Sequence, residues 1–526
     1  MSTTMKTPGV YIQELDAFGN AVVPVPTAIP AFIGYTAKTS FNGKSILNIA
    51  VKVTSLSEFL LIFGDEAPQV QYNITSTLQT DKSQKNKTKE QDGFTTGGYA
   101  YSITPATIKY RMYSSIKFFY ENGGGTCYIM SIGTYDYSKP AITDTTGFMN
   151  AITLFEKETE PTILVIPDAV EIMDPTADAT SSTYLQDKYA NAYSLQNAMI
   201  NHCGEMMNRI AILDIPGGYS EPLVGTTSFE QFRNSIKDSN FNSYAAAYYP
   251  WLHTTVFQTS EISYKNIDKK AYSQVTQLLN LEFTDAKGVI NPEMAKIISA
   301  FSATPATSLD KASVALQNLS TSYQLLIGSI MADMNLMAPS AGMAGIYTTV
   351  DNNEGVWVAP ANLRVQSTIS PAIKIDHATQ EDLNVPINGK SICAIRAFTG
   401  RGNLVWGART LDGNSNDWRY INVRRTMIYI EQSIKNAAKA YVFAPNDPGT
   451  WVNVKSMISN FLTGLWQQGG LVGSRPADAF SVSVGLGSTM TGDDILNGIM
   501  RVTIKVAISR PAEFIEITFQ QEMQKS

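Results

Sequence analysis

Three short apolar runs, separated by helical stretches, constrain the fold of this chain more than any other feature. The runs occupy residues 127–132, 163–168 and 209–216, and residues 184–208 have the composition of a helix between the last two. Strands that are apolar on both faces are typical of buried sheets. The alternation therefore predicts an open α/β sheet covered by helices on both faces, followed by a helix-rich stretch to about residue 335.

The C-terminal part of the chain carries the clearest local signals. Asp447 and Pro448 predict the start of a helix that presents one apolar stripe. An earlier helix is expected from about 417 to 434. Apolar residues that alternate with polar ones predict strands at 480–484 and 502–508. Helices followed by strands indicate an α+β unit in this region.

Both ends of the chain contain strand-like pieces with no local partner. Prolines restrict their predecessors to extended geometry, so the first ~35 residues are interpreted as an extended arm rather than a core segment. A final strand is expected after the break at Pro511. Isolated strands are unstable until they pair with a sheet. The residues assigned to these terminal strands are Val10, Tyr11, Ile12, Ile515, Ile517 and Phe519.

Composition argues against several classes of partner. Charged residues make up 16 % of the 526 residues, and the net charge is −6, against roughly 25 % charged residues in an average soluble chain. An acidic chain has no bulk attraction to nucleic acid or to anionic lipid, whereas a sparsely charged surface repels copies of itself weakly. We expect no nucleic acid, no membrane insertion and no signal peptide.

The motifs that suggest chemistry are all incomplete. Two Gly-Lys-Ser tripeptides, at 43–45 and 389–391, lack the earlier glycine that a phosphate loop needs. The Asn-Gly-Gly-Gly run at 122–125 is interpreted as a tight turn before the first apolar run. His202 and Cys203 are neighbours on a predicted helix, where their side chains point about 100° apart and cannot grip one ion.

The remaining candidate groups are isolated in sequence. Asp168, Asp214 and Glu513 are each expected to be a cap or an ion-pair partner rather than a catalytic acid or base. The three cysteines have no disulfide or metal spacing and are expected to be buried thiols. No catalytic residue, cofactor or metal is therefore predicted.

Residues 405–425 hold two tryptophans and four arginines in twenty-one positions. Such a cluster suits phosphate binding, an interface or an intramolecular core with ion pairs. Apolar neighbours and the acidic chain count against phosphate, whereas Arg and Trp are enriched at protein interfaces. The sequence leaves core and interface open. The anchors are Trp406, Arg409, Trp418, Arg419, Arg424 and Arg425.

Long motifs stand in order along the chain, among them PGVYIQELDAFGNAVVPVPTAIPAFIGYT at 8–36, PSAGMAGIYTTVDNNEGVWVAPAN at 339–362, INGKSICAIRAFTGRGNLVWGARTL at 387–411 and FAPNDPGTW at 443–451. Together they resemble one known family, the sheath proteins of contractile tails. The resemblance covers about residues 7–40 and 335–520. It extends more weakly to RIAILDIP at 209–216 and SYAAAYYPWL at 243–252, and residues 41–105 carry no motif that resembles the family.

The resemblance implies a structural subunit without enzymatic activity. Family members stack as six-fold rings around an inner tube, and contraction drives the tube through a target envelope. Terminal arms add strands to the sheets of neighbouring subunits. The implied partners are other copies of the chain, the inner tube protein, baseplate and tail-terminator proteins, and sister sheath proteins. The implied location is a virion or phage-tail-like particle assembled in the bacterial cytoplasm.

The expected fold class is a multidomain α+β and α/β protein, with a C-terminal α+β sheath core, exchanged terminal strands and a middle α/β insertion. Residues 80–98 are polar and are expected to form a solvated loop. Two other functions stay open: a non-contractile surface-layer or fibre protein, and a soluble α/β hydrolase or transferase. The expected segments are 1–24 (N-terminal arm), 25–105 (start of the core), 106–335 (middle α/β domain), 336–510 (C-terminal core) and 511–526 (C-terminal arm).

Overall fold

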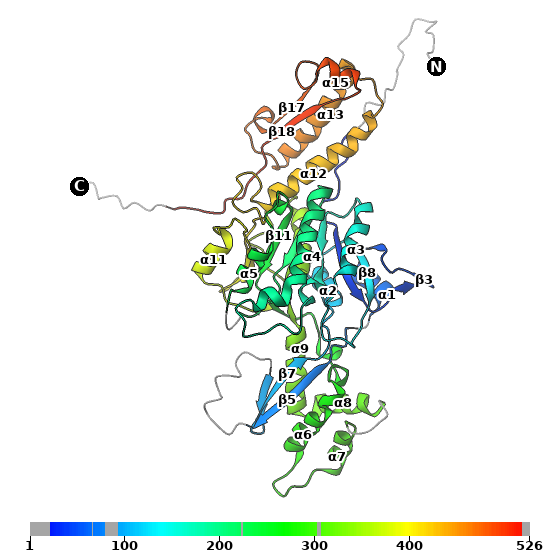
Figure 1. Ribbon diagram of the computed structural model, residues 1–526, viewed down its shortest axis with the longest axis vertical. Helices are drawn as coiled ribbons and strands as arrows, with labels where there is room; N and C mark the ends of the chain where they lie inside the picture. The colour runs from blue at the N-terminus through cyan, green and yellow to red at the C-terminus, as the bar shows by residue number, and fades with distance from the viewer. Residues whose placement is uncertain (1–20, 66, 79–92, 222–224, 302–306, 518–526) are drawn as a thin grey trace, which may run out of the picture. The chain divides into compact units, whose positions relative to one another are not determined.

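A computed structural model describes residues 21–65, 67–78, 93–221, 225–301 and 307–517 (Figure 1). The chain divides into two units, each of which is discontinuous in sequence. The smaller unit contains Met1–Val25 and Tyr429–Ser509, and the larger unit contains Pro26–Ile428 and Arg510–Ser526.

An eight-stranded sheet forms the centre of the larger unit (Figure 1). Neighbouring strands from β15 to β8 are parallel, and the two edge strands, β16 and β4, are antiparallel to their neighbours. In spatial order the strands are β16 (Gly402–Trp406), β15 (Cys393–Phe398), β11 (Ala245–Tyr249), β10 (Ile210–Asp214), β9 (Ile163–Val165), β1 (Pro30–Thr36), β8 (Cys127–Thr134) and β4 (Ala50–Val53).

The three apolar runs of the sequence form strands β8, β9 and β10, as predicted. Every residue of β9, β10 and β11 is buried, so both faces of the sheet are covered in its centre. Helix α4 packs against β10, and helices α2 and α10 pack against each other and against the sheet. The predicted helix at 184–208 is α4, and it ends at Met206.

The larger unit contains eleven α-helices among its described residues, and the helix-rich stretch expected before residue 335 is present as α6 to α9. The helices are α1 (Leu56–Phe63), α2 (Met112–Glu121), α3 (Thr146–Leu154), α4 (Tyr184–Met206), α5 (Ser228–Ser235), α6 (Tyr272–Phe283), α7 (Pro292–Ser299), α8 (Thr307–Leu319), α9 (Thr321–Met334), α10 (Ser340–Asn353) and α11 (His377–Asn384).

Strand β1 corrects the interpretation of the first ~35 residues as an arm. Residues 30–36 are extended, but they lie between β8 and β9 in the middle of the sheet. Phe32 and Ile33 are completely buried, because parallel neighbours on both sides and helices above and below enclose them. The main sheet thus takes strands from the expected segments 25–105, 106–335 and 336–510.

The loop predicted at 80–98 is partly a strand. Residues Gly93–Thr96 form β6, which pairs antiparallel with β7 (Tyr99–Pro105); β7 also pairs with β5 (Tyr72–Leu78). Gly97 and Gly98 both have positive φ, at 57° and 77°, and such a turn joins two strands closely. The ring of Phe94 stacks on Tyr101 at 5.1 Å, so cross-strand packing outweighs the polar composition.

Two further sheets in the larger unit are small. Strands β2 (Ser40–Phe41) and β3 (Lys44–Ser45) form a short hairpin. Strand β12 (Leu252–Thr254) lies between β13 (Leu336–Met337) and β14 (Thr368–Pro371).

The smaller unit has the α+β composition expected from its sequence. Asp447 caps α13 by accepting a hydrogen bond from the Thr450 amide at 2.9 Å, and α13 packs against β17. The hairpin of β17 and β18 buries little by itself, so this helix stabilises it. The elements are α12 (Ile421–Ala438, which contains the boundary between the units), α13 (Pro448–Gln467), α14 (Pro476–Ala479), β17 (Phe480–Val484), α15 (Gly492–Leu496) and β18 (Val502–Val506).

The strand expected at the C-terminus is absent from residues 511–517. Ile515 and Ile517 are 78 % and 69 % exposed, and within the described residues no strand lies beside them. An extended segment needs a paired edge to count as a strand. Phe519 and the predicted N-terminal strand residues Val10, Tyr11 and Ile12 lie outside the described residues.

Candidate functional site

The carboxylates singled out from the sequence have structural partners. Asp168 accepts hydrogen bonds from the backbone amides of Tyr35 at 2.9 Å and Arg111 at 2.6 Å. Asp214, at the end of β10, accepts from the amide and the hydroxyl of Ser340 at 2.8 and 2.5 Å. Each carboxylate ties the sheet to the start of a helix, which is a capping role.

Asp214 should make stability depend on pH. Burial raises its pKa from 3.8 to about 7, although both bonds from Ser340 favour the charged form. Because the pKa of Asp214 is higher in the folded protein than in the unfolded chain, the unfolded chain releases this proton at lower pH. The free energy of unfolding therefore falls as pH rises from about 4 to about 7. Asp214→Asn should therefore gain roughly 1–2 kcal/mol relative to wild type between about pH 5 and about pH 7.5.

Urea unfolding of both proteins at the two pH values measures this difference. Asp174→Asn is the control, because Asp174 is fully exposed and its pKa is lowered by hydrogen bonds from Thr176. A difference between Asp214→Asn and wild type that is the same at both pH values would contradict the assignment.

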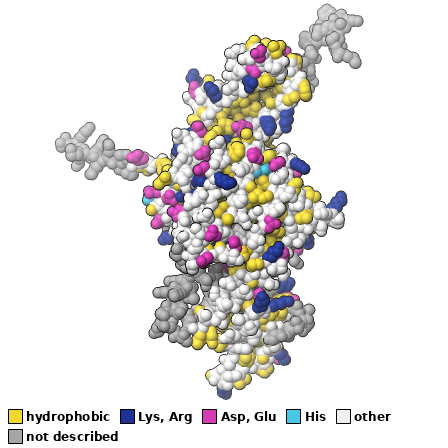
Figure 2. All heavy atoms as spheres, in the orientation of Figure 1, with side chains coloured by type: hydrophobic (Ala, Val, Ile, Leu, Met, Phe, Trp, Pro, Cys, Tyr) yellow, Lys and Arg dark blue, Asp and Glu magenta, His cyan; other side chains and the backbone are white. Residues whose placement is uncertain are grey.

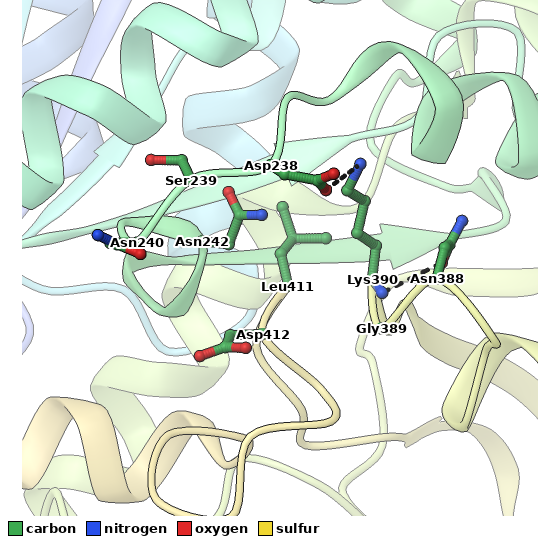
Figure 3. Close-up of a pocket in the computed structure, with 9 residues that line it drawn as sticks. All are labelled: Asp238, Ser239, Asn240, Asn242, Asn388, Gly389, Lys390, Leu411 and Asp412. Atoms are coloured by element: carbon green, nitrogen blue, oxygen red, sulfur yellow. Dashed lines mark hydrogen bonds and ion pairs between the residues drawn. The ribbon is translucent and has the colours of Figure 1, made fainter.

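Gly389 and Lys390 of the second Gly-Lys-Ser tripeptide line a polar pocket of about 480 Å³, but the lysine already has hydrogen-bond partners (Figure 3). The ammonium of Lys390 donates to the carbonyls of Arg233 and Ile236 at the end of α5 and lies 3.0 Å from Asp238. An ammonium has three hydrogens, so none is left for a phosphate. The tripeptide therefore has a structural role, in agreement with the missing glycine of the phosphate-loop motif.

The remaining ligand candidates are also structural. The turn at 122–125 is present, with Gly123 at φ 87°. Burial lowers the pKa of His202 to about 4, and the three cysteines are free and buried. Burial raises the pKa of each thiol to about 12. Among the described residues, no group of His, Cys, Asp and Glu is placed to hold a metal ion.

Arg424 lies inside the larger unit between two aromatic rings. Its guanidinium carbon is 3.5 Å from the ring centre of Trp418 and 4.3 Å from that of Tyr244. One amino group donates to the hydroxyl of Ser243 at 2.8 Å. A planar cation stacked in this way suits a desolvated core position.

Arg425 forms a buried ion pair with α10. Its two amino groups donate to the carboxylate of Asp351 at 2.8 and 2.6 Å, and the two side chains are 3 % and 2 % exposed. The guanidinium also donates to the carbonyl of Thr27 and lies over the ring of Tyr347. This pair joins the start of α12 to α10 and to the segment before β1.

Arg409 holds the base of the C-terminal segment. It donates to both carboxylate oxygens of Glu513, with the shortest contact at 2.6 Å. Asn384 and Tyr420 donate to the same carboxylate at 2.7 and 3.0 Å. Burial would raise the pKa of Glu513, but these hydrogen bonds outweigh it and lower the pKa.

The other two anchors lie nearer the surface. Arg419 donates to the carbonyl of Ser415 at 2.8 Å and to the amide oxygen of Asn416, which are both local contacts. Trp406 is 37 % exposed and packs against Phe398, with ring centres 4.6 Å apart. The anchors therefore do not converge on one site: three arginines are internal, and Trp406 is the anchor with the largest exposed aromatic surface.

The partners of these arginines were not found from the sequence. Tyr244, Asp351, Asn384 and Glu513 are separated from their arginines by between 25 and 180 residues. No local spacing signals such pairs. Glu513 was expected to be an ion-pair partner, and this is confirmed, but its arginine was not identified.

The surface carries no strong charge asymmetry on the face shown in Figure 2. Among the described residues on that face, basic and acidic side chains are interspersed over a mostly neutral surface. None of the helices in the described residues combines the length and the apolar character that crossing a bilayer requires.

Comparison with known sequences identifies relatives of one kind. Residues 414–522 match the family described as Phage tail sheath C-terminal domain. The tail sheath protein of Vibrio phage KVP40 is 28 % identical over 169 residues, and that of Burkholderia phage BcepMu is 27 % identical over 141 residues. These matches cover 30 % and 26 % of this chain, and 24 % and 29 % of the phage proteins. The chain thus spans about a quarter of the length of the curated relatives it matches.

Solved structures match over the whole length. The sheath complex of an extracellular contractile injection system, PVC, in its contracted state is 25 % identical, covers 99 % of both chains and has a TM-score of 0.57. The contracted helical sheath of the anti-feeding prophage is 23 % identical, covers 99 % of this chain and 100 % of the other, and has a TM-score of 0.58. The second likeness supports the fold. The chain is therefore a relative of the contractile tail sheath proteins, with which it shares the C-terminal domain in sequence and the fold along its whole length.

Proposed function

We propose that this chain is the repeating subunit of a contractile sheath in a phage tail or a tail-like injection particle. Copies stack as six-fold rings around an inner tube, and contraction of the cylinder drives the tube through a target envelope. The observation that carries the proposal is the match to the PVC sheath over 99 % of both chains. Baseplate and tail-terminator proteins are the further partners that this role requires, and sister sheath proteins can share the cylinder.

The terminal segments are proposed to link the subunits. Phe514, Ile515 and Ile517 expose most of their side chains to solvent, which is unfavourable unless another surface covers them. Within the described residues, the outer edges of the β17–β18 pair carry no further strand, apart from one bridge between Leu471 and Ile508 just after β18. A strand from another copy can add to such an edge through main-chain hydrogen bonds. We assign the same role to Val10, Tyr11 and Ile12.

The anchors divide into two roles in this proposal. Arg409, Arg424 and Arg425 hold the inner body of each subunit together, with Trp418 stacked on Arg424. Trp406 offers an exposed aromatic face and is proposed to contact a neighbouring subunit or the tube. Arg419 stabilises the loop at residues 415–419 through its contacts with Ser415 and Asn416.

Electron microscopy of negatively stained protein tests the assembly. The chain is expressed alone and together with the tube protein encoded near it, and both samples are imaged over a range of concentrations. Striated tubes with six-fold end views are expected. Flat lattices would favour a surface-layer protein, and isolated particles at every concentration would contradict assembly.

A further inference from the structure

Among residues 510–517, the part of the C-terminal segment that the structure describes, Glu513 makes the strong contacts with the body of the subunit. Phe514, Ile515 and Ile517 are 75 %, 78 % and 69 % exposed. By contrast, the side chain of Glu513 is 18 % exposed. Arg510 lies 4.0 Å from Asp417, and both side chains are more than half exposed, so this contact contributes little.

Glu513 occupies a site in which donors converge from three places in the body. Asn384 is the last residue of α11, Arg409 follows β16, and Tyr420 immediately precedes α12. Their four donor atoms form five contacts of 2.6 to 3.2 Å with the carboxylate. We call these four residues the Glu513 clamp.

Arg409 is also held by other residues of the subunit body. The second amino group of Arg409 donates to the carbonyls of Asn384 at 3.3 Å and Gly413 at 3.2 Å, and the Arg409 side chain is 4 % exposed. These contacts therefore hold the Arg409 guanidinium in one orientation independently of Glu513. A fixed, planar fork accepts a carboxylate in one geometry.

We propose that Glu513 is a positioning residue for assembly: the clamp fixes the point at which the C-terminal segment leaves its own subunit, and so sets where residues 514–517 meet a second copy of this chain. This inference rests on the proposed sheath function. Residues 514–517 can turn about this point when subunits move, while the point of departure stays constant.

The length of the free C-terminal segment, which acts as a tether between subunits, determines how strongly loss of the clamp should weaken assembly. With the clamp closed, the free segment starts at Glu513; without it, the segment starts near Arg510. Three more free residues add up to ~10 Å of reach, and the effective concentration of the segment at its target falls as about the −3/2 power of tether length. For a tether that grows from about five to about eight residues, the loss is about twofold at each subunit joint, and it compounds as a tube grows.

Glu513→Ala tests this in assembly, with Glu205→Ala as the matched control. Glu205 is an exposed glutamate on α4 of the same unit, outside the C-terminal segment, so its replacement changes the charge equally and leaves the clamp and residues 514–517 intact. The amount of sedimentable tube at fixed concentration should fall several-fold for Glu513→Ala and stay at the wild-type level for Glu205→Ala. If Glu513→Ala does not fold, Glu513→Gln keeps one acceptor oxygen and should give an intermediate loss.

Cleavage by a glutamate-specific protease tests the clamp in unassembled subunits. Wild-type protein should be cut after Glu516 faster than after Glu513. Tyr420→Phe removes one donor to Glu513 and should raise cleavage after Glu513 about fivefold, because a hydrogen bond to a charged group is lost, without changing cleavage after Glu516. A purely structural role would lower the unfolding midpoint without this local change.

The outcomes separate the two proposals. If wild-type protein forms no tubes, the sheath function fails, and the protease result still decides whether the clamp exists. If wild-type protein forms tubes and Glu513→Ala forms them equally well, or if both alanine variants lose them equally, the positioning role is wrong.

Discussion

Replacing Arg425 by methionine should destabilise the larger unit by about 3–5 kcal/mol, because the Asp351 carboxylate would stay buried without its cation. The side chain of Asp351 is 2 % exposed, and its carboxylate accepts two hydrogen bonds from Arg425 at 2.8 and 2.6 Å. Water cannot replace these donors without opening the contact between α10 and α12. Methionine fills a similar volume, so lost packing is a minor part of the effect.

Urea unfolding followed by circular dichroism measures this loss as a lower midpoint. Arg401→Met is the matched control, since Arg401 is exposed and donates to Asn362; it should change stability by less than about 0.5 kcal/mol. The double variant Arg425→Met/Asp351→Leu removes both charges and should recover most of the loss. A double variant as unstable as Arg425→Met would show that the buried charge is not the cause.

Ending the chain after Glu513 should abolish long tubes while leaving the subunit folded. The truncation removes Phe514, Ile515 and Ile517, which are exposed in the subunit, and keeps the Glu513–Arg409 pair. At least about tenfold less assembly is expected if the segment contributes ~1.4 kcal/mol or more to each joint. Deleting residues 1–22 should have a similar effect.

Imaging of negatively stained samples and sedimentation measure assembly, and the unfolding midpoint of each truncation controls for folding. A chain that ends at Arg510 provides a second comparison. It loses Glu513 as well, so Arg409 keeps a buried charge without its carboxylate and the midpoint should fall in addition. Long tubes from both the N-terminal deletion and the chain ending at Glu513 would overturn the linking role of the ends.

The elements predicted in the right place have short-range causes, although their ends differ by up to three residues: the run at 163–168 is a strand only as far as Val165. Strands β8, β9 and β10 and helix α13 follow from the spacing of apolar residues and, for α13, from the Asp447 cap and Pro448. Strand β6 was missed because its polar residues form a strand through pairing with β7, which a local pattern does not reveal.

The arginine cluster at residues 405–425 also shows that local sequence patterns do not reveal long-range contacts. The sequence indicates that residues 405–425 are anchors, and it leaves core and interface open. The structure places Arg409, Arg424 and Arg425 in three separate buried contacts. Their partners come from elements far away in the sequence, so the choice between core and surface depends on how the chain folds.

The sequence by itself determined the helices and strands with strong periodicity, the absence of a complete ligand motif, and a set of motifs that resemble contractile sheath proteins. These are local properties, because side-chain spacing and backbone preference act over a few residues. Only the tertiary structure decided that β1 lies between β8 and β9, that Asp351 neutralises Arg425, and that Glu513 is held by Arg409. Each of these contacts joins distant parts of the chain, and its free energy is gained only when the whole unit has folded.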